Sequence, residues 1–267
     1  MATTGRVGHP LPYDVYRQAI ERETLRFAEV VRDVDPGTAV PSCPAWTLAD
    51  LMRHVGTLQR WFSALLTARV RERPSSRNVD PGPDDARERA DWVAAGVPAV
   101  AAVLRDTDPG TPMWAWGEDQ YARFWARRML FETLVHRVDA ERAVGRRSGV
   151  DPVLAADGVD EFLVNLPHAG SFAPAVTELR GSGETIAFRC ADPGDGEWRV
   201  RLDPDGLRPL TPTDADRAGR PESQAAVRAS AADLLLLLYG RRQYHEDGYE
   251  VTGDTVLLDR WFAHTAF

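Results

Sequence analysis

Apolar residues recur every three to four positions along four stretches in the first half of the chain, which is the spacing of one face of an α-helix. The first stretch covers residues 13–34 and ends at an Asp-Pro-Gly sequence that stops a helix. The second stretch runs from residue 47 to about residue 70. Thr47 can cap this helix, with Asp50 three positions later as its partner in a capping box.

The third and fourth stretches complete the predicted helical half. The third covers residues 84–104, with Gly96 and Pro98 as weak points near its middle. The fourth covers residues 124–145 and ends at a glycine. Four helices joined by short and medium loops predict an up-and-down four-helix bundle, a fold that can build metal sites in its core.

After residue 149 the pattern changes from helical to mixed. Residues 184–190 and 197–203 alternate with period two, as strands do, and a Gly-Asp-Gly turn lies between them. Three further elements are predicted: a helix at 230–240 capped by Ser230, short strands at 249–251, and a last helix at 257–265. We therefore expect a bundle over residues 1–148 and a smaller α+β domain over residues 149–267.

Composition narrows the class of protein. The chain has 267 residues, of which 43% are hydrophobic and 27% charged, as in soluble globular proteins. Its net charge of −8 argues against sequence-independent nucleic-acid binding, and no apolar run approaches the about 20 residues that a membrane-spanning helix needs. With only two cysteines a disulfide framework is excluded, so we expect a cytoplasmic protein. All 32 basic residues are arginine, which excludes every mechanism that uses a catalytic lysine.

Three polar residues lie on the apolar faces of the second and fourth predicted helices. They are His54, Glu132 and His136. Side chains four apart on a helix are neighbours, so Glu132 and His136 can bind one ion, and a histidine from a facing helix gives a three-ligand site with an open position. Two alternatives remain: Glu132 can pair with Arg128 on the surface, and His54 can be a core histidine bonded to a carbonyl.

Three residues near these candidates each have more than one possible role. Asp50 and Asp139 lie one turn from His54 and His136, where they can orient the imidazoles or serve as capping and surface residues. Cys43 precedes the second helix and can be a fourth ligand, a resolving thiol or a small buried residue.

Four segments, 43–56, 131–145, 231–241 and 253–267, resemble the mycothiol-dependent maleylpyruvate isomerase family, in order and over nearly the whole chain. The resemblance implies a DinB-like N-terminal bundle followed by a smaller α+β domain. It also implies that His54, Glu132 and His136 bind zinc and that mycothiol is the thiol cosubstrate.

The chemistry implied by the resemblance is attack of a thiolate on a small electrophile. Coordination to zinc lowers the pKa of a thiol, so that the thiolate exists at neutral pH. In S-transfer the sulfur stays on the electrophile; in isomerisation of a maleylpyruvate-like substrate it adds to a conjugated double bond and leaves after rotation. The alternative is a non-catalytic member that binds a metal or a small molecule. A monomer and a homodimer are both compatible with the sequence.

Five further residues are candidates for binding or catalysis. Trp61, Trp114 and Trp116 can line the pocket for mycothiol and the electrophile, or can be ordinary packing residues. Arg241 and Arg228 flank the apolar helix at 230–240, and either can bind an acidic substrate, although a structural role is open for both.

Overall fold

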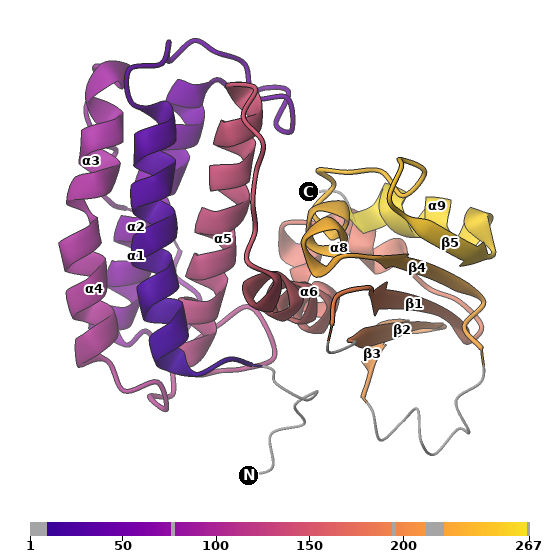
Figure 1. The fold of residues 1–267 in the computed structure, drawn as a ribbon. Helices are drawn as coiled ribbons and strands as arrows, with labels where there is room; N and C mark the ends of the chain where they lie inside the picture. Colours follow the sequence, from indigo (N-terminus) through magenta and orange to yellow (C-terminus); the bar gives the residue numbers. More distant parts are fainter. Residues whose placement is uncertain (1–9, 76–77, 194–195, 212–221, 266–267) are drawn as a thin grey trace. The chain divides into compact units, whose positions relative to one another are not determined.

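The computed structural model describes residues 10–75, 78–193, 196–211 and 222–265 (Figure 1). They form two compact units, the first spanning Pro12–Ser148 and the second beginning at Gly149. The architecture is the predicted one, a helical N-terminal region followed by a small domain with a mixed sheet. Among the residues described, no helix is both long and apolar enough to cross a membrane.

The first unit is a helical bundle. Its elements are α1 (Tyr13–Val31), α2 (Leu48–Ala68), the 3₁₀ turn η1 (Ala86–Glu88), α3 (Arg89–Ala95), α4 (Val97–Asp106) and α5 (Ala122–Ala143). Helix α5 packs along α1 and also against α2, and most of its side chains are buried. Helix α1 ends at Val31, earlier than predicted, and Asp33 then takes a positive φ of 58°.

The third predicted helix is two helices. Helix α3 ends at Ala95 and α4 begins at Val97, with Gly96 between them. Pro98 has no N–H to donate to the carbonyl four residues earlier, so the hydrogen-bond ladder cannot continue, and the proline falls instead in the first turn of a new helix. The sequence identifies this weak point but does not predict a full break.

Helix α2 begins at the predicted capping box. The Thr47 side chain accepts a hydrogen bond from the backbone N–H of Asp50, and the Asp50 carboxylate accepts one from the backbone N–H of Thr47 at 2.9 Å. The Thr47 hydroxyl also donates to the Asp50 carboxylate, at 2.7 Å, and this bond together with the one from the Thr47 backbone is the main reason that the pKa of Asp50 lies below its ordinary value. Of the two roles open to Asp50, capping is the one that the structure shows.

Gly56 on α2 allows the side chain of Trp92, a residue of α3, to lie directly against the helix. A Cβ atom at Gly56 would stand 1.9 Å from Cζ3 of Trp92. The Trp92 ring is fixed there by a hydrogen bond from its Nε1 to Asp80 (3.2 Å) and by the Arg60 guanidinium, 3.9 Å from the ring centroid. The indole therefore fixes the loop before α3 against α2.

We expect Gly56→Ala to destabilise the first unit. Overpacking of this kind costs about 1–3 kcal/mol. Alanine favours a helix interior by about 1 kcal/mol, but the ring cannot move without losing both of its contacts, so the clash outweighs that gain. Chemical denaturation measures the difference. Gly149→Ala is the matched control, because nothing lies within 4 Å of a Cβ built there; equal stabilities of the two variants would contradict the prediction.

The second unit contains a five-stranded sheet with helices. Its elements are α6 (Pro152–Asn165), η2 (Leu166–Ser171), η3 (Pro174–Glu178), β1 (Glu184–Cys190), β2 (Glu197–Asp203), β3 (Gly206–Leu210), β4 (Ala225–Ala229), α8 (Ala231–Leu238), β5 (Glu250–Gly253) and α9 (Thr255–Thr265). The strand order is β3-β2-β1-β4-β5; β1 and β4 are parallel and the other pairs are antiparallel. Helix α8 packs against β1 and β4, α9 against β4 and α6 against β2.

The predicted elements of this unit are present, with Ser230 as the cap of α8. The sequence pattern did not predict α6, β3, β4 or the two 3₁₀ segments η2 and η3. Helix α6 buries Asp157 and Glu161, which interrupt its apolar pattern, and β4 is rich in alanine, a poor strand former. Part of the predicted Gly-Asp-Gly turn, residues 194–195, lies outside the described residues.

Candidate metal centre

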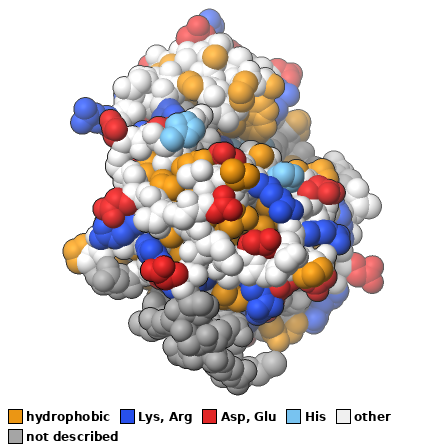
Figure 2. Space-filling model, turned by 90° about the vertical axis from the view of Figure 1, so that its right-hand side faces the viewer, with side chains coloured by type: hydrophobic (Ala, Val, Ile, Leu, Met, Phe, Trp, Pro, Cys, Tyr) orange, Lys and Arg blue, Asp and Glu red, His pale blue; other side chains and the backbone are white. Residues whose placement is uncertain are grey.

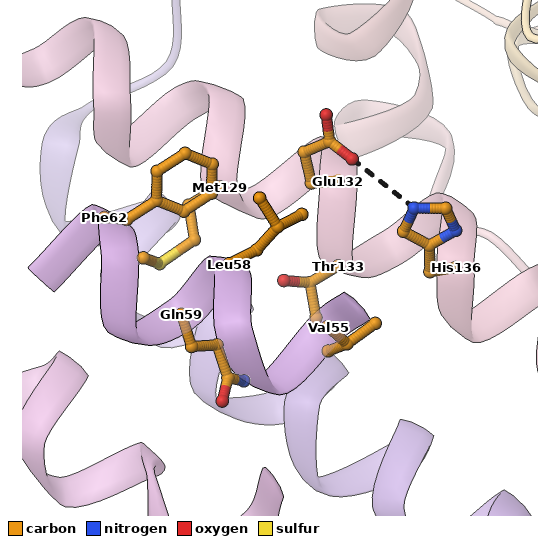
Figure 3. A pocket seen from close by; sticks show the side chains of 8 residues that line it. All are labelled: Val55, Leu58, Gln59, Phe62, Met129, Glu132, Thr133 and His136. Carbon is orange, nitrogen blue, oxygen red and sulfur yellow. Dashed lines mark ion pairs between the residues drawn. The ribbon is translucent and has the colours of Figure 1, made fainter. Parts of the chain in front are cut away.

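His54 on α2 and Glu132 and His136 on α5 converge, as the positions on the two helices predict. Each offers one ligand atom, and these three atoms lie within 4.8 Å of one another. The two imidazole centroids are 4.8 Å apart with the rings at 83°, and Nε2 of His136 is 3.5 Å from the Glu132 carboxylate (Figure 3). The geometry brings together two nitrogen donors and one oxygen donor; their binding of a metal remains a prediction.

Glu132 is ionised. Burial raises its pKa, but the Arg128 guanidinium, a hydrogen bond with His136 and the charges of both histidines outweigh burial and place the pKa well below its ordinary value. Arg128 lies 3.0 Å from Oε1 of Glu132. The Arg128–Glu132 pair, considered as an alternative to the metal site, is therefore present, yet it leaves Oε2 facing His136.

His136 is almost completely buried and is held between two carboxylates. Burial lowers its pKa, but hydrogen bonds with Asp139 and Glu132 outweigh burial and raise the pKa above the ordinary value. The metal-free ring therefore holds its proton more tightly than a free histidine does. A metal that binds here must displace this proton, so its affinity decreases as the pH falls.

Trp46 lies against the two imidazoles, a position that the sequence pattern did not predict. Its ring centroid lies 4.8 Å from that of His54 and 6.1 Å from that of His136. A tight turn places it there, in which Val40 donates to the Trp46 carbonyl and Trp46 donates to the Cys43 carbonyl. The only signal in the sequence is its position immediately before the cap of α2.

A narrow pocket adjoins Glu132 and His136 (Figure 3). Its remaining lining residues are Val55, Leu58, Gln59 and Phe62 from α2 and Met129 and Thr133 from α5. The wall is thus mainly apolar. The pocket is too narrow to admit a water molecule, so a substrate can occupy it only if the side chains that line it move.

The three tryptophans singled out from the sequence form an aromatic cluster elsewhere in the bundle. Trp61 and Trp114 each lie 5.4 Å from Trp125, between ring centroids, and Trp116 packs edge to face on Phe124. None of the three lines the pocket beside Glu132. Their contacts are those of packing residues, and a role in binding mycothiol remains a prediction.

Cys43 does not join the three ligands. Its Sγ is 4.0 Å from the Asp139 carboxylate, and the cluster of candidate ligands found in the described residues does not include it. Cys43 is only partly buried, so it is not a fully buried packing residue, and among the described residues it forms no disulfide.

The two candidate arginines belong to the second unit. Arg228 on β4 is exposed and forms a 2.8 Å ion pair with Glu250, its cross-strand neighbour on β5. Arg241 follows α8, is buried and donates to the Tyr239 carbonyl at 2.6 Å. Exposed ion pairs such as Arg228–Glu250 are common where acidic and basic side chains are interspersed on the surface, as Figure 2 shows for one face. Catalytic roles for both arginines remain predictions.

A helical bundle with a His-Glu-His cluster, followed by a small mixed-sheet domain, defines a class of two-domain protein with a candidate metal centre. Family models identify the class further. The Mycothiol maleylpyruvate isomerase N-terminal domain matches residues 17–141, and the MDMPI C-terminal domain matches residues 153–260. The chain belongs to the mycothiol-dependent maleylpyruvate isomerase family, as the sequence segments indicate, and thus to a family of enzymes.

Two crystal structures share the fold over 94% of this chain and 96% of theirs. One is the mycothiol-dependent maleylpyruvate isomerase, with a TM-score of 0.57 and 16% identity. The other is a histidine-to-alanine mutant of the mycothiol-dependent maleylpyruvate isomerase, with a TM-score of 0.58 and 15% identity. Identities this low establish the fold alone. A comparison with curated proteins gave no match.

Proposed function

We propose that the protein is a zinc-dependent enzyme that uses mycothiol to attack a small electrophilic molecule. The observation that carries the proposal is the convergence of His54, Glu132 and His136 in a chain of this family. Three protein ligands with one open position are the pattern of catalytic zinc sites, whereas structural sites use four.

The donor set fits zinc. Two imidazoles and one carboxylate are ligands that zinc accepts, and Glu132 is already in its charged form. When bound, zinc lowers the pKa of a thiol that takes the fourth position, which makes the thiolate available at neutral pH. The bonds of Arg128 to one oxygen of Glu132 and of Asp139 to one nitrogen of His136 keep both side chains in place for this role.

The apolar wall supports the same function. Leu58, Phe62 and Met129 line the pocket beside Glu132 and His136 with apolar groups, which would limit the access of water to a nucleophile held at the metal. The pocket is closed to a water-sized molecule in this structure, so a compact electrophile would enter only after its lining side chains moved, and the sugar portion of mycothiol would stay outside. Both S-transfer and isomerisation of a maleylpyruvate-like substrate begin with attack by sulfur, so the same residues serve either reaction. For an acidic substrate, Arg241 and Arg228 are the candidate anchors.

Cobalt substitution tests the proposal. Adding mycothiol to the cobalt-loaded protein should produce a sulfur-to-metal charge-transfer band, because the thiol displaces water from the fourth position. Glu132→Gln should weaken the band, since it removes the negative ligand, whereas Glu118→Gln, an exposed carboxylate in a loop, should not. A cobalt spectrum that saturating mycothiol leaves unchanged would reject the thiol-dependent reaction. The better account would then be a metal site that activates water by lowering the pKa of the bound water to about 7.

A further inference from the structure

Asp139 is a buried carboxylate beside the metal centre that supplies none of the three ligand atoms. It lies on α5 one turn after His136 and is fully inaccessible to solvent. One of its oxygens, Oδ2, is 3.0 Å from Nδ1 of His136, and the other, Oδ1, accepts a hydrogen bond of 2.6 Å from Oγ of Ser42. Both oxygens are therefore engaged, one by a candidate ligand and one by a segment 97 residues away in sequence.

The contact with Asp139 selects one form of the His136 ring. A neutral imidazole carries one N–H, on either nitrogen. A carboxylate is only an acceptor, so the ring proton is stabilised on Nδ1, next to Asp139. Glu132 also faces the ring, through Nε2, but at the longer distance of 3.5 Å against 3.0 Å for Asp139, so in the neutral ring the proton favours Nδ1 and the lone pair is on Nε2. We propose that Asp139, held by Ser42, is a positioning residue that fixes His136 with Nε2 directed at the metal. This inference rests on the proposed metal site.

The bond from Ser42 shows why the carboxylate cannot turn away. Ser42 lies in the turn before α2, the same turn that brings Trp46 over the two imidazoles. The arrangement is not a nucleophilic serine triad, because the Ser42 hydroxyl bonds to the carboxylate and not to the imidazole. It fixes a ligand on α5 relative to the segment that leads into α2, the helix that carries His54.

Asp50 provides a matched contrast. It stands one turn before His54, as Asp139 stands one turn after His136, but its carboxylate caps α2 through Thr47. Replacing each aspartate with asparagine changes the same chemical group about one helical turn from a candidate ligand, four residues before His54 and three after His136. Only Asp139→Asn should alter the metal centre, whereas Asp50→Asn should alter only the cap.

Two measurements on the full chain test the role of Asp139. In zinc titrations we expect Asp139→Asn to weaken binding by about 10–100-fold, the usual effect of losing an outer-shell partner, and Asp50→Asn to leave it within about twofold. Nitrogen-15 NMR of the zinc-free protein, at a pH where His136 is neutral, should show the proton on Nδ1 in the wild type and a mixture of tautomers in Asp139→Asn. Ser42→Ala should give a smaller change in the same direction.

The two measurements separate this inference from the proposed function. If the wild type binds no zinc, the proposed function fails, and the tautomer measurement alone decides the role of Asp139. A wild-type ring protonated on Nε2, or an Asp139→Asn variant with unchanged tautomer and unchanged zinc affinity, would overturn the inference. A variant with lower thermal stability but an unchanged tautomer would assign Asp139 to the fold alone and would overturn it equally.

Discussion

Replacing His54 with alanine is expected to abolish zinc binding and thiol-dependent turnover and to leave the first unit folded. His54 supplies the only candidate ligand from α2, so its loss leaves Glu132 and His136 on one helix, which is too few ligands for a stable site. The loss in zinc affinity should exceed the about 10–100-fold that removal of an outer-shell partner causes. The bundle should survive because its core, which includes Leu48, Leu51 and Val55 on the same helix, does not depend on the imidazole.

Thermal melts with and without zinc, together with metal analysis, measure this outcome. A ligand that binds only the folded state raises stability in proportion to the logarithm of its concentration over its dissociation constant, so zinc should raise the wild-type melting temperature and not that of His54→Ala. His168→Ala is the control, because His168 lies exposed in η2 and outside the candidate cluster. One zinc per chain in His54→Ala would mean that other residues hold the metal.

The three candidate ligands could be predicted from helix geometry, but the residues around them could not. Glu132 and His136 share a helix, so their proximity follows from spacing alone, and His54 needs only a facing helix of the bundle. Trp46 and Ser42 reach the site through a turn whose path the helical pattern does not encode. Asp50 and Asp139 have similar spacings from a histidine, so the sequence does not distinguish their roles. In the structure the Ser42 hydroxyl binds the Asp139 carboxylate, whereas the Thr47 hydroxyl binds that of Asp50.

The second unit was less predictable because its pairing is not local. Strands β1 and β2 form a hairpin with clear alternation, which the sequence shows directly. Strand β4 joins the sheet by parallel pairing with β1, about 40 residues earlier, and its alanines are buried only because that neighbour covers them. Helix α6 buries acidic side chains that a pattern of apolar residues assigns to solvent.

Arg137→Met is expected to cost about 3–5 kcal/mol of stability, one of the largest effects of any single change in the bundle. Arg137 is fully buried between α1 and α5, where its guanidinium bonds to Glu23 at 2.9 Å and to Glu141 at 2.6 Å. Removing the arginine leaves two almost completely buried carboxylates without this cation. Arg26 lies 3.4 Å from Glu141 and 3.5 Å from Glu23, and Arg22 lies 3.3 Å from Glu23, but both of these arginines are partly exposed, so they compensate only in part.

Urea denaturation compares Arg137→Met with Arg123→Met, a change on the same helix. Arg123 pairs with Asp119 at 2.7 Å in a solvent-exposed position, where such a pair contributes about 0–1 kcal/mol. Adding Glu23→Gln and Glu141→Gln to Arg137→Met should recover part of the loss, because the cost arises from unpaired buried charge and not from the missing side chain alone. If the two arginine variants lose the same stability, the ion pairs of Arg137 do not hold α1 against α5, and apolar packing carries that interface.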